Sequence, residues 1–579
     1  MHRLRISLCA CSALLMFLAG TPASALAASE GSGPLLGKEI DFTPNQPDLI
    51  GDADIPVGPD LATQLGSSRD ARGENHGSVQ INDPALDNIQ VFPGTRPFEE
   101  SVQSETSMVT FGRNVVVGYN SSADQPLVLT PAGLFFTHRH LSGYSFSHDG
   151  GRTWTSGFIP PSPGSLFTFG DPALAVDRAG NFYYASIGAD AAGSSDITVS
   201  KSTDGGSTFA PAVIVTLDPG ADKEWIAVGA DPAHPERDNV YVTWTSFKAA
   251  SSQLMLAKST DGGATFSSRS LFAPVDNTVM SAFIQFTQPT VDASNGRLYI
   301  PFLHFSDFDA DFIKVLVSDD GGANFHFLRF NVPGAPDAFG FPNVTPGTVA
   351  DCGKNNGGIR LILHSGANIG GGRFGLPRFV HATRLVTQPS SAAHDGRLFI
   401  AINSSTSPIS GDPAAKSEIH MLFSPDGGQS FQVSVVAAAT AADPQHVHPA
   451  LSIDRQGRHV SIGYYVQQAN DQLRVDLANG QVTGHRVVWG EDVQNLSPAF
   501  DLTPSNIPLP TATNPFATTN YDRTIRACYD IGEYMSTTYS HERVLAAWGD
   551  NRNSWTSPAG SPAVGIHSQP DVFASLSTA

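Results

Sequence analysis

Apolar and polar residues alternate in short runs along most of this chain, and the runs end in clusters of Gly, Asp, Asn and Ser. Leu254 and Leu256, for example, alternate with other residues just before Lys258 and Ser259. A period of two residues predicts β-strands, and the clusters between them predict tight turns. The abundance of Gly (55) and Pro (41), with only 15% charged residues, favours the same class. The pattern therefore predicts an all-β protein with many short strands.

Five segments fit one octamer, S-x-D-x-G-x-x-(F/W), and each carries Asp-Gly-Gly at its centre. Asp accepts hydrogen bonds from nearby backbone N–H groups and Gly permits a positive φ, so the octamer predicts a self-capped hairpin turn. A turn that satisfies its own carboxylate leaves little for a ligand. We therefore interpret the five aspartates as structural rather than catalytic or calcium-binding: Asp149, Asp204, Asp261, Asp320 and Asp426.

A second element recurs between the octamers, with a polar residue, a short apolar strand, a turn, and a strand that ends in aromatic residues. Its seven copies begin at Glu105, Asp171, Glu224, Gln288, Gln388, His448 and Glu533. Each copy predicts two strands and each octamer hairpin adds two more, which gives four-stranded units. The count predicts seven such units.

Two places break the rhythm of the repeats. The fourth and fifth octamers lie about twice as far apart as the others, and a Gly-rich stretch separates them. We interpret residues 329–387 as an insertion; an additional unit without an octamer is the alternative. The unit after His448 has only a degenerate turn at residues 476–480. Six or eight units therefore remain alternatives to seven.

The N-terminal 27 residues have the parts of a secretory signal peptide. Arg3 and Arg5 precede an apolar run over residues 6–19, and small-residue cleavage signals follow. The run is shorter than the roughly 20 residues that span a bilayer. We therefore expect a secreted or periplasmic protein that does not insert into a membrane. Residues 28–98 read as an extended segment, and we expect a strand from it to complete the last unit, whose sheet edge is otherwise unpaired.

The charge of the chain limits the classes of molecule that it can bind, and its cysteine content predicts one covalent link. A net charge of −20 repels phosphate backbones and anionic lipid, so nucleic acid is a poor partner. Cys352 and Cys528 are the only cysteines left after cleavage, and an even pair in a secreted chain predicts one disulfide; two buried thiols are the alternative. Two cysteines cannot form a cysteine zinc site. We expect a monomer, and a family resemblance of the octamers implies that its partner is carbohydrate or glycoprotein.

The octamers, such as Ser147-His148-Asp149-Gly150-Gly151-Arg152-Thr153-Trp154, resemble the Asp boxes, or BNR repeats, of the sialidase superfamily. The resemblance covers residues 99–579 and implies a β-propeller in which each box joins the third and fourth strands of a blade on the rim. It is specific for fold and not for activity, because many Asp-box propellers are not sialidases.

In a propeller, the seven repeat starts converge on the mouth of the central channel. Carboxylates are the groups that glycosidic bond cleavage requires, one as acid and one as base or nucleophile. The catalytic candidates are Glu105, Asp171, Glu224, Glu533 and Tyr534, and the substrate-binding candidates are Gln288, Gln388 and His448. A solvated structural ring is the alternative interpretation. No metal ligand or cofactor is assigned, although a structural cation such as calcium is compatible with the acidic mouth.

Sialidases carry an arginine triad, a Tyr nucleophile paired with Glu, and an acidic acid/base, and their first arginine stands in an R-I-P motif. Here Thr95-Arg96-Pro97 lacks the Ile, whereas Glu533 and Tyr534 supply a Tyr and a Glu. The resulting prediction is a secreted sialidase-like glycoside hydrolase that acts on an exposed glycan at the channel mouth. The alternative is a noncatalytic propeller that binds glycan or protein.

Overall fold

The fold of this chain is described from a computed structural model. The described residues are 67–69, 75–86, 103–124, 126–130, 133–306, 309–344, 347–349, 382–384, 388–409, 412, 414–469, 472–489, 500–501, 507–508, 534–540, 543–556 and 566–578. The predicted signal peptide, the middle of the predicted insertion, Glu533 and both Cys352 and Cys528 lie outside them. The pairing of these two cysteines therefore stays a prediction.

The described chain is almost entirely β-structure, which confirms the all-β class, and one 3-10 turn (Pro84–Leu86) is the helical element among these residues. Most strands form antiparallel units of four in chain order. Unit 1 contains β3 (Gln103–Phe111), β4 (Asn114–Asp124), β7 (Arg139–Ser147) and β8 (Thr155–Phe158); unit 2 contains β9 (Phe167–Val176), β10 (Phe182–Ala189), β11 (Ser195–Ser202) and β12 (Val213–Leu217); unit 3 contains β13 (Ala221–Asp231), β14 (His234–Lys248), β15 (Ser251–Ser259) and β16 (Ser267–Phe272).

The later units follow the same order with additions at their edges. Unit 4 contains β17 (Met280–Gln285) with β18 (Thr290–Val291), then β19 (Leu298–Ser306), β20 (Asp311–Ser318), β21 (His326–Phe327) and β22 (Phe341–Asn343); unit 5 contains β25 (Ser390–His394), β26 (Arg397–Ser405), β27 (Ser417–Ser424) and β28 (Gln432–Ala437); unit 6 contains β29 (Gln445–Ile453), β30 (His459–Gln467), β31 (Gln472–Thr483), β32 (Arg486–Trp489), β33 (Phe500–Asp501) and β34 (Ile507–Pro508). Two hairpins stand outside the units, β5 (Leu127–Thr130) with β6 (Gly133–Phe136), and β23 (Gly347–Val349) with β24 (Ala382–Arg384).

The last unit combines the two ends of the described chain. It contains β35 (Ser536–Ser540), β36 (Arg543–Thr556) and β37 (Ile566–Thr578), and β37 pairs antiparallel with β2 (Asn75–Gln80), which pairs with β1 (Ser67–Arg69). Ser78, for example, lies opposite Ser575. A strand from before residue 99 thus occupies the edge of β37 that would otherwise have no partner.

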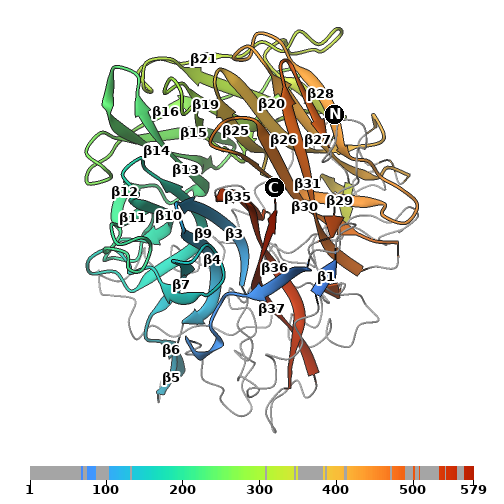
Figure 1. The fold of residues 1–579 in the computed structure, drawn as a ribbon. Coiled ribbons are helices and arrows are strands. Elements are labelled where there is room, and N and C mark those ends of the chain that lie inside the picture. The colour runs from blue at the N-terminus through green and yellow to red at the C-terminus, as the bar shows by residue number, and fades with distance from the viewer. Residues whose placement is uncertain are drawn as a thin grey trace.

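The units are arranged as a β-propeller. The first strand of each unit contacts the first strand of the next, through β18 in unit 4, and β35 contacts β3. Thr106 of β3 donates a 2.6 Å hydrogen bond to the carbonyl of Ala547, which joins unit 1 to the last unit. In Figure 1 the first strands of units 1 and 2, β3 and β9, face the middle of the view, and later strands such as β7 and β12 lie farther out.

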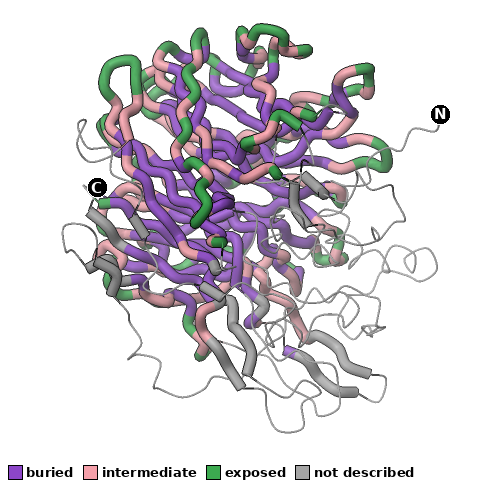
Figure 2. Tube along the Cα trace, turned by 90° about the vertical axis from the view of Figure 1, so that its right-hand side faces the viewer, coloured by how far each residue is buried: buried purple, intermediate pink, exposed green. Residues whose placement is uncertain are grey.

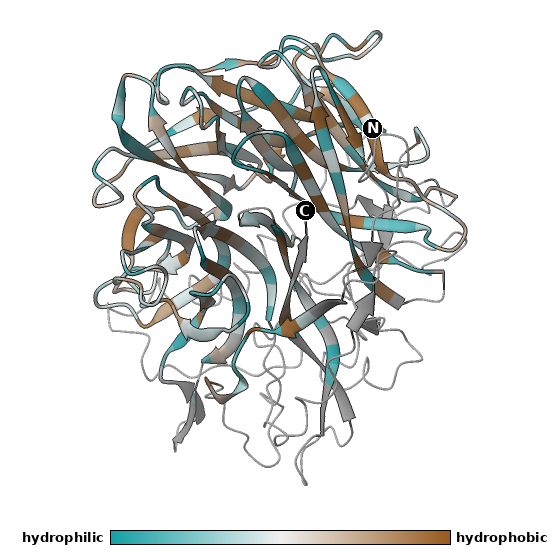
Figure 3. Cartoon of the chain, viewed as in Figure 1, coloured by the Kyte–Doolittle hydropathy of each residue, from teal (hydrophilic) through white to brown (hydrophobic). Residues whose placement is uncertain are grey.

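The core lies between the faces of neighbouring units. Val115 and Val117 of β4, for example, pack in one buried cluster with Leu545 and Ala547 of β36. Figure 2 shows buried residues along the strands and exposed residues at the outer turns, and Figure 3 shows apolar stretches on the same strands. Burial of apolar side chains between sheets therefore holds each unit against the next.

The five octamer turns share one set of hydrogen bonds. In the first, the Ser147 hydroxyl donates to Asp149 Oδ1 at 2.7 Å and accepts from the Gly151 N–H at 2.9 Å, while the Thr153 N–H and hydroxyl donate to the two oxygens of Asp149. The same arrangement recurs around Asp204, Asp261, Asp320 and Asp426. Each carboxylate is used within its own turn.

Candidate functional site at the centre of the propeller

In several units, a β-bulge on the first strand gives one residue an unusual backbone conformation. In unit 2, Gly170 pairs with Ile187 and the next pair is Ala173 with Ala185, so two residues of β9 oppose one of β10. The first residue of the bulge has a positive φ, an uncommon conformation for residues other than glycine. The residues with this conformation at the bulge are Glu105 (53°), Asp171 (55°), Lys223 (50°) and His448 (57°), and Phe286 (59°) has it between β17 and β18.

The bulges correct the predicted alignment of the repeats. Lys223 and Phe286 occupy the place equivalent to Glu105, while Glu224 lies one residue and Gln288 two residues farther along. Alternation alone does not reveal this offset, because the residue that a bulge leaves unpaired is decided by pairing with the next strand. Sequence reasoning consequently missed Lys223.

Lys223 joins two of the predicted carboxylates. Its Nζ lies 3.1 Å from Oε1 of Glu105 and 3.1 Å from Oδ2 of Asp171. Asn120 of β4 donates to Glu105 Oε2 at 3.0 Å and accepts from the Asp171 N–H at 2.7 Å. Lys223, Glu105 and Asp171 are 5%, 2% and 1% exposed, so the three charges are held away from water and depend on each other.

Glu224 is buried beside this ionic group, but in the described part of the chain its carboxyl group lacks a hydrogen-bond partner. It is 2% exposed, and neither carboxyl oxygen has a hydrogen-bond partner among the described residues. Burial, followed by the negative charge of Asp171, raises the pKa of Glu224 well above its ordinary value. A buried carboxyl group that retains its proton is suited to donating it as a general acid.

Tyr534 brings the last unit to the same cluster. Its hydroxyl donates a 3.1 Å hydrogen bond to the carbonyl of Pro172, and its ring packs edge-on against Trp225 with centroids 5.3 Å apart. Lys223 Nζ lies 5.6 Å from the centre of the Tyr534 ring. Burial and the charges of Glu105 and Asp171 raise the pKa of Tyr534, so its phenol is neutral. We call Glu105, Asp171, Lys223, Glu224 and Tyr534 the central cluster.

The side chains of Gln288 and Gln388, which the sequence predicts to bind substrate, form hydrogen bonds with backbone groups between units 4 and 5. Gln388 donates to the Thr287 carbonyl at 2.7 Å, and the Gln288 side chain accepts from the Ser391 N–H. Ser107 and Ser390 act in the same way, since their hydroxyls accept from the N–H groups of Leu174 and Leu451 in the next unit. These contacts lock neighbouring units together.

His448, the remaining residue predicted to bind substrate, is buried at the bulge of unit 6. Its backbone N–H donates to Asn403 Oδ1 at 3.0 Å, as the backbone N–H of Asp171 does to Asn120. Its ring packs edge-on against Tyr465, with ring centroids 5.9 Å apart. The structure thus brings Glu105, Asp171, Glu224 and Tyr534 into one cluster. Glu533 lies outside the described residues.

Two part-buried arginines form ion pairs with aspartates of their own unit. Arg474 contacts Asp443 and Asp476 at 2.8 Å each, and Arg552 Nε donates to Asp550 at 2.8 Å. In the central cluster, the cation facing the carboxylates is Lys223. A metal ion placed between Glu105 and Asp171 would therefore have to displace the lysine ammonium group.

Among the described residues, no helix is long and apolar enough to cross a membrane. No protein-family model matches the chain, and no curated protein matches it.

Solved structures that are similar to this chain include two sialidases and a polysaccharide lyase. A Hadza microbial sialidase is 12% identical, covers 76% of this chain and 75% of its own, and has a TM-score of 0.38. An ulvan lyase described as a new family of polysaccharide lyase is 11% identical, with coverages of 74% and 91% and a TM-score of 0.37. A Trypanosoma rangeli sialidase is 12% identical, with coverages of 86% and 58% and a TM-score of 0.35. Likeness at this level says nothing about the chemistry of the present chain.

Proposed function

We propose that this chain is a secreted, seven-bladed β-propeller that hydrolyses a glycosidic bond at its central cluster. The observation that carries the proposal is the pairing of two unlike carboxyl groups, a protonated Glu224 beside an Asp171 that is ion-paired with Lys223. A glycosidase requires two carboxyl groups, one of which donates a proton while the other acts as base or nucleophile. Export rests on the sequence of residues 1–27.

The contacts of the first strands support the proposed blade count. These strands succeed one another from β3 to β35, and β35 returns to β3, so the seven units account for a complete turn. A closed ring of blades leaves only short, protected strand edges, which favours a propeller over an open array. A count of seven favours the interpretation of the long stretch between units 4 and 5 as an insertion, with an eighth blade as the alternative.

The proposed reaction assigns a separate role to each central residue. Glu224 donates its proton to the leaving-group oxygen as the bond to the anomeric carbon breaks, and Asp171 acts as base or nucleophile on the opposite face. Lys223 forms ion pairs with Asp171 and Glu105 and holds both carboxylates in position, since its ammonium group lies 3.1 Å from each. Tyr534 and Trp225 provide an aromatic wall for a sugar ring.

Exo-sialidase activity is the more specific form of this proposal. The neighbourhood of Tyr534 and Glu105 supports it, because a tyrosine with an adjacent glutamate is the expected nucleophile pair, and burial together with the charge of Glu105 raises the pKa of Tyr534. Lys223 would then bind the carboxylate of the sugar in place of an arginine. A sialoside therefore belongs among the first substrates to test.

A noncatalytic propeller that binds glycan or protein is the second candidate. The low exposure of the cluster favours it, since Glu105, Asp171 and Glu224 are each at most 2% exposed. In that case the charges hold the inner strands together, and the ligand binds at the surface of the propeller mouth.

A hydrolysis screen of residues 28–579 over chromogenic glycosides, including a sialoside, separates the two candidates. For a substrate that is cleaved, Glu224→Gln should lower kcat by about 10²–10⁴-fold, and Glu236→Gln, which changes an exposed glutamate, should have no effect. Full turnover by Glu224→Gln and Asp171→Asn would contradict catalysis at the cluster. Glycan binding without turnover of any substrate would support the noncatalytic candidate.

A further inference from the structure

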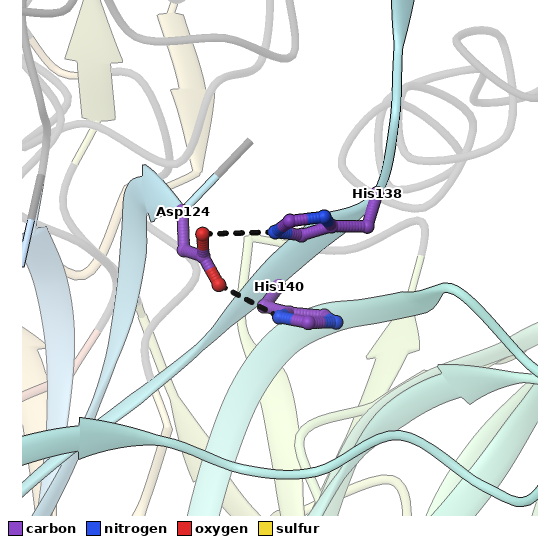
Figure 4. A group of neighbouring side chains, drawn as sticks. All are labelled: Asp124, His138 and His140. Carbon is purple, nitrogen blue, oxygen red and sulfur yellow. Dashed lines mark hydrogen bonds and ion pairs between the residues drawn. The ribbon is translucent and has the colours of Figure 1, made fainter. Parts of the chain in front are cut away.

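A second group of polar side chains lies on unit 1, at the ends of β4 and β7. Asp124 is the last residue of β4 and pairs directly with His140 of β7, and His138 lies two residues before His140. Side chains two residues apart on an extended chain share a face, so both histidines are on the side of Asp124 and Arg139 points away. Figure 4 shows the two rings facing the carboxylate.

The three side chains converge at close range. His138 Nε2 lies 2.9 Å from Oδ1 of Asp124, and His140 Nδ1 lies 2.7 Å from Oδ2. The two imidazole rings stack with centroids 4.4 Å apart. One donor atom from each residue lies within 4.8 Å of the donor atoms of the other two, which is the spacing of ligands around a single ion.

We propose that Asp124, His138 and His140 form a binding site for a divalent transition-metal ion of the zinc class. Two imidazole nitrogens and one carboxylate oxygen are ligands that such ions prefer, whereas calcium and magnesium take oxygen ligands. Three protein ligands leave a coordination position for water or another ligand. The ion's double positive charge would also offset the negative charge of the Asp124 carboxylate.

The site is accessible to an ion from solution. The side chains of His138, His140 and Asp124 are 26%, 22% and 15% exposed, so the group is neither buried in the core nor fully solvated. A partly exposed group of this kind can take up an ion without unfolding of the blade.

The position of the site suggests its effect. Asp124 precedes the β5–β6 hairpin and both histidines follow it, and the Thr137 N–H donates to the Pro126 carbonyl at 3.0 Å across the hairpin base. Figure 1 shows β5 and β6 extending beyond β7 at the edge of unit 1. A bound ion would join both ends of the hairpin and fix its direction relative to the blade.

Zinc binding to the full mature chain tests the proposal. Residues 28–579 are stripped with EDTA, dialysed, incubated with ZnCl₂ and passed through a gel-filtration column, and bound zinc is measured by mass spectrometry. We expect one zinc ion per chain in the wild type and its loss in Asp124→Asn, His138→Ala and His140→Ala. His420→Ala is the matched control, because His420 contacts a single carboxylate, Glu418, at 3.0 Å; it should keep the zinc.

A second measurement covers variants that fold poorly. Zinc should slow proteolytic cleavage within residues 127–136 and raise Tm in the wild type and in His420→Ala, but not in His138→Ala, whose side chain is the most exposed of the three. Wild-type protein that binds no zinc, or His138→Ala and His140→Ala variants that bind as much as wild type, would overturn the proposal. Neither result bears on the central cluster, so this test is independent of the proposed hydrolysis.

Discussion

The ammonium group of Lys223 lies 3.1 Å from a carboxylate oxygen of Glu105, although 118 residues separate the two along the chain. Lys223 belongs to unit 3 and Glu105 to unit 1, and Asp171 of unit 2 lies between them in sequence and shares the same ammonium group. The ion pair thus links three consecutive blades at their inner strands. Its burial makes it sensitive to the removal of any one charge.

Replacement of Lys223 by methionine should destabilise the protein by about 3–5 kcal/mol, because it leaves two buried carboxylates without their cation. Lys248→Met is the control, since Lys248 is 49% exposed and lies 3.5 Å from Asp218; its cost should not exceed about 1 kcal/mol. Denaturant unfolding measures both free energies. Equal stability of the two variants would show that the central charges are not coupled to folding.

Glu224 should make the stability of the protein fall as pH rises. Its pKa is raised in the folded state, so the unfolded chain releases this proton first, and the free energy of unfolding declines above the pKa of an unfolded glutamate, about 4.3. Glu224→Gln removes that decline, and its advantage over wild type should grow with pH. Thermal unfolding from pH 4 to 8 measures the effect, with Glu236→Gln as an exposed control; parallel curves for wild type and Glu224→Gln would refute it.

Asp320 and its neighbour Asp319 allow the stability contribution of the octamer turn to be compared with that of an exposed surface charge. Asp320 accepts from the Ser318 hydroxyl at 2.8 Å and the Asn324 N–H at 2.9 Å, so Asp320→Ala should cost about 1–2 kcal/mol. Asp319 is 61% exposed and contacts Arg297, and Asp319→Ala should cost about 0.5 kcal/mol or less. Urea unfolding of both variants gives the comparison.

The same turn has an acid dependence of opposite sign to that of Glu224. Hydrogen bonds from Asn324 lower the pKa of Asp320 to about 2, so its contribution is present above the pKa of an unfolded aspartate and is lost as pH falls toward 2. The difference in stability between wild type and Asp320→Ala should therefore shrink below pH 4. A constant difference down to pH 2 would mean that the carboxylate charge does not matter.

Glycines of the octamers differ in how closely they approach the preceding blade. Gly206 and Gly150 have φ values of 91° and 79°, but a Cβ on Gly206 would lie 2.2 Å from a methyl group of Val116, whereas one on Gly150 meets nothing within 4 Å. Gly150→Ala should cost about 1–2 kcal/mol from backbone strain. Gly206→Ala should cost about 1–3 kcal/mol more, because Val116 must move. Calorimetry that finds equal Tm values would contradict close packing of the turn on unit 1.

Local sequence was sufficient for the strands and the octamer turns. Alternating residues give one buried and one outward face to each strand, and every hydrogen bond of Asp149 within its turn reaches at most four residues along the chain. Such interactions form wherever the octamer occurs, because their partners are supplied by the same short segment. The all-β class and the repeated unit could therefore be predicted without knowledge of the fold.

Only the tertiary structure decided which side chains meet at the centre and on unit 1. The bulges place Lys223 rather than Glu224 at the repeat position, and an irregularity in β4 between Asn120 and Asp124 brings Asp124 opposite His140. Both outcomes depend on the register between strands, and the place of the extra, unpaired residue of a bulge is decided by pairing with the next strand. Contacts across 118 residues, such as that of Lys223 with Glu105, are then fixed by the packing of neighbouring units, because that packing brings the inner strands of units 1, 2 and 3 together.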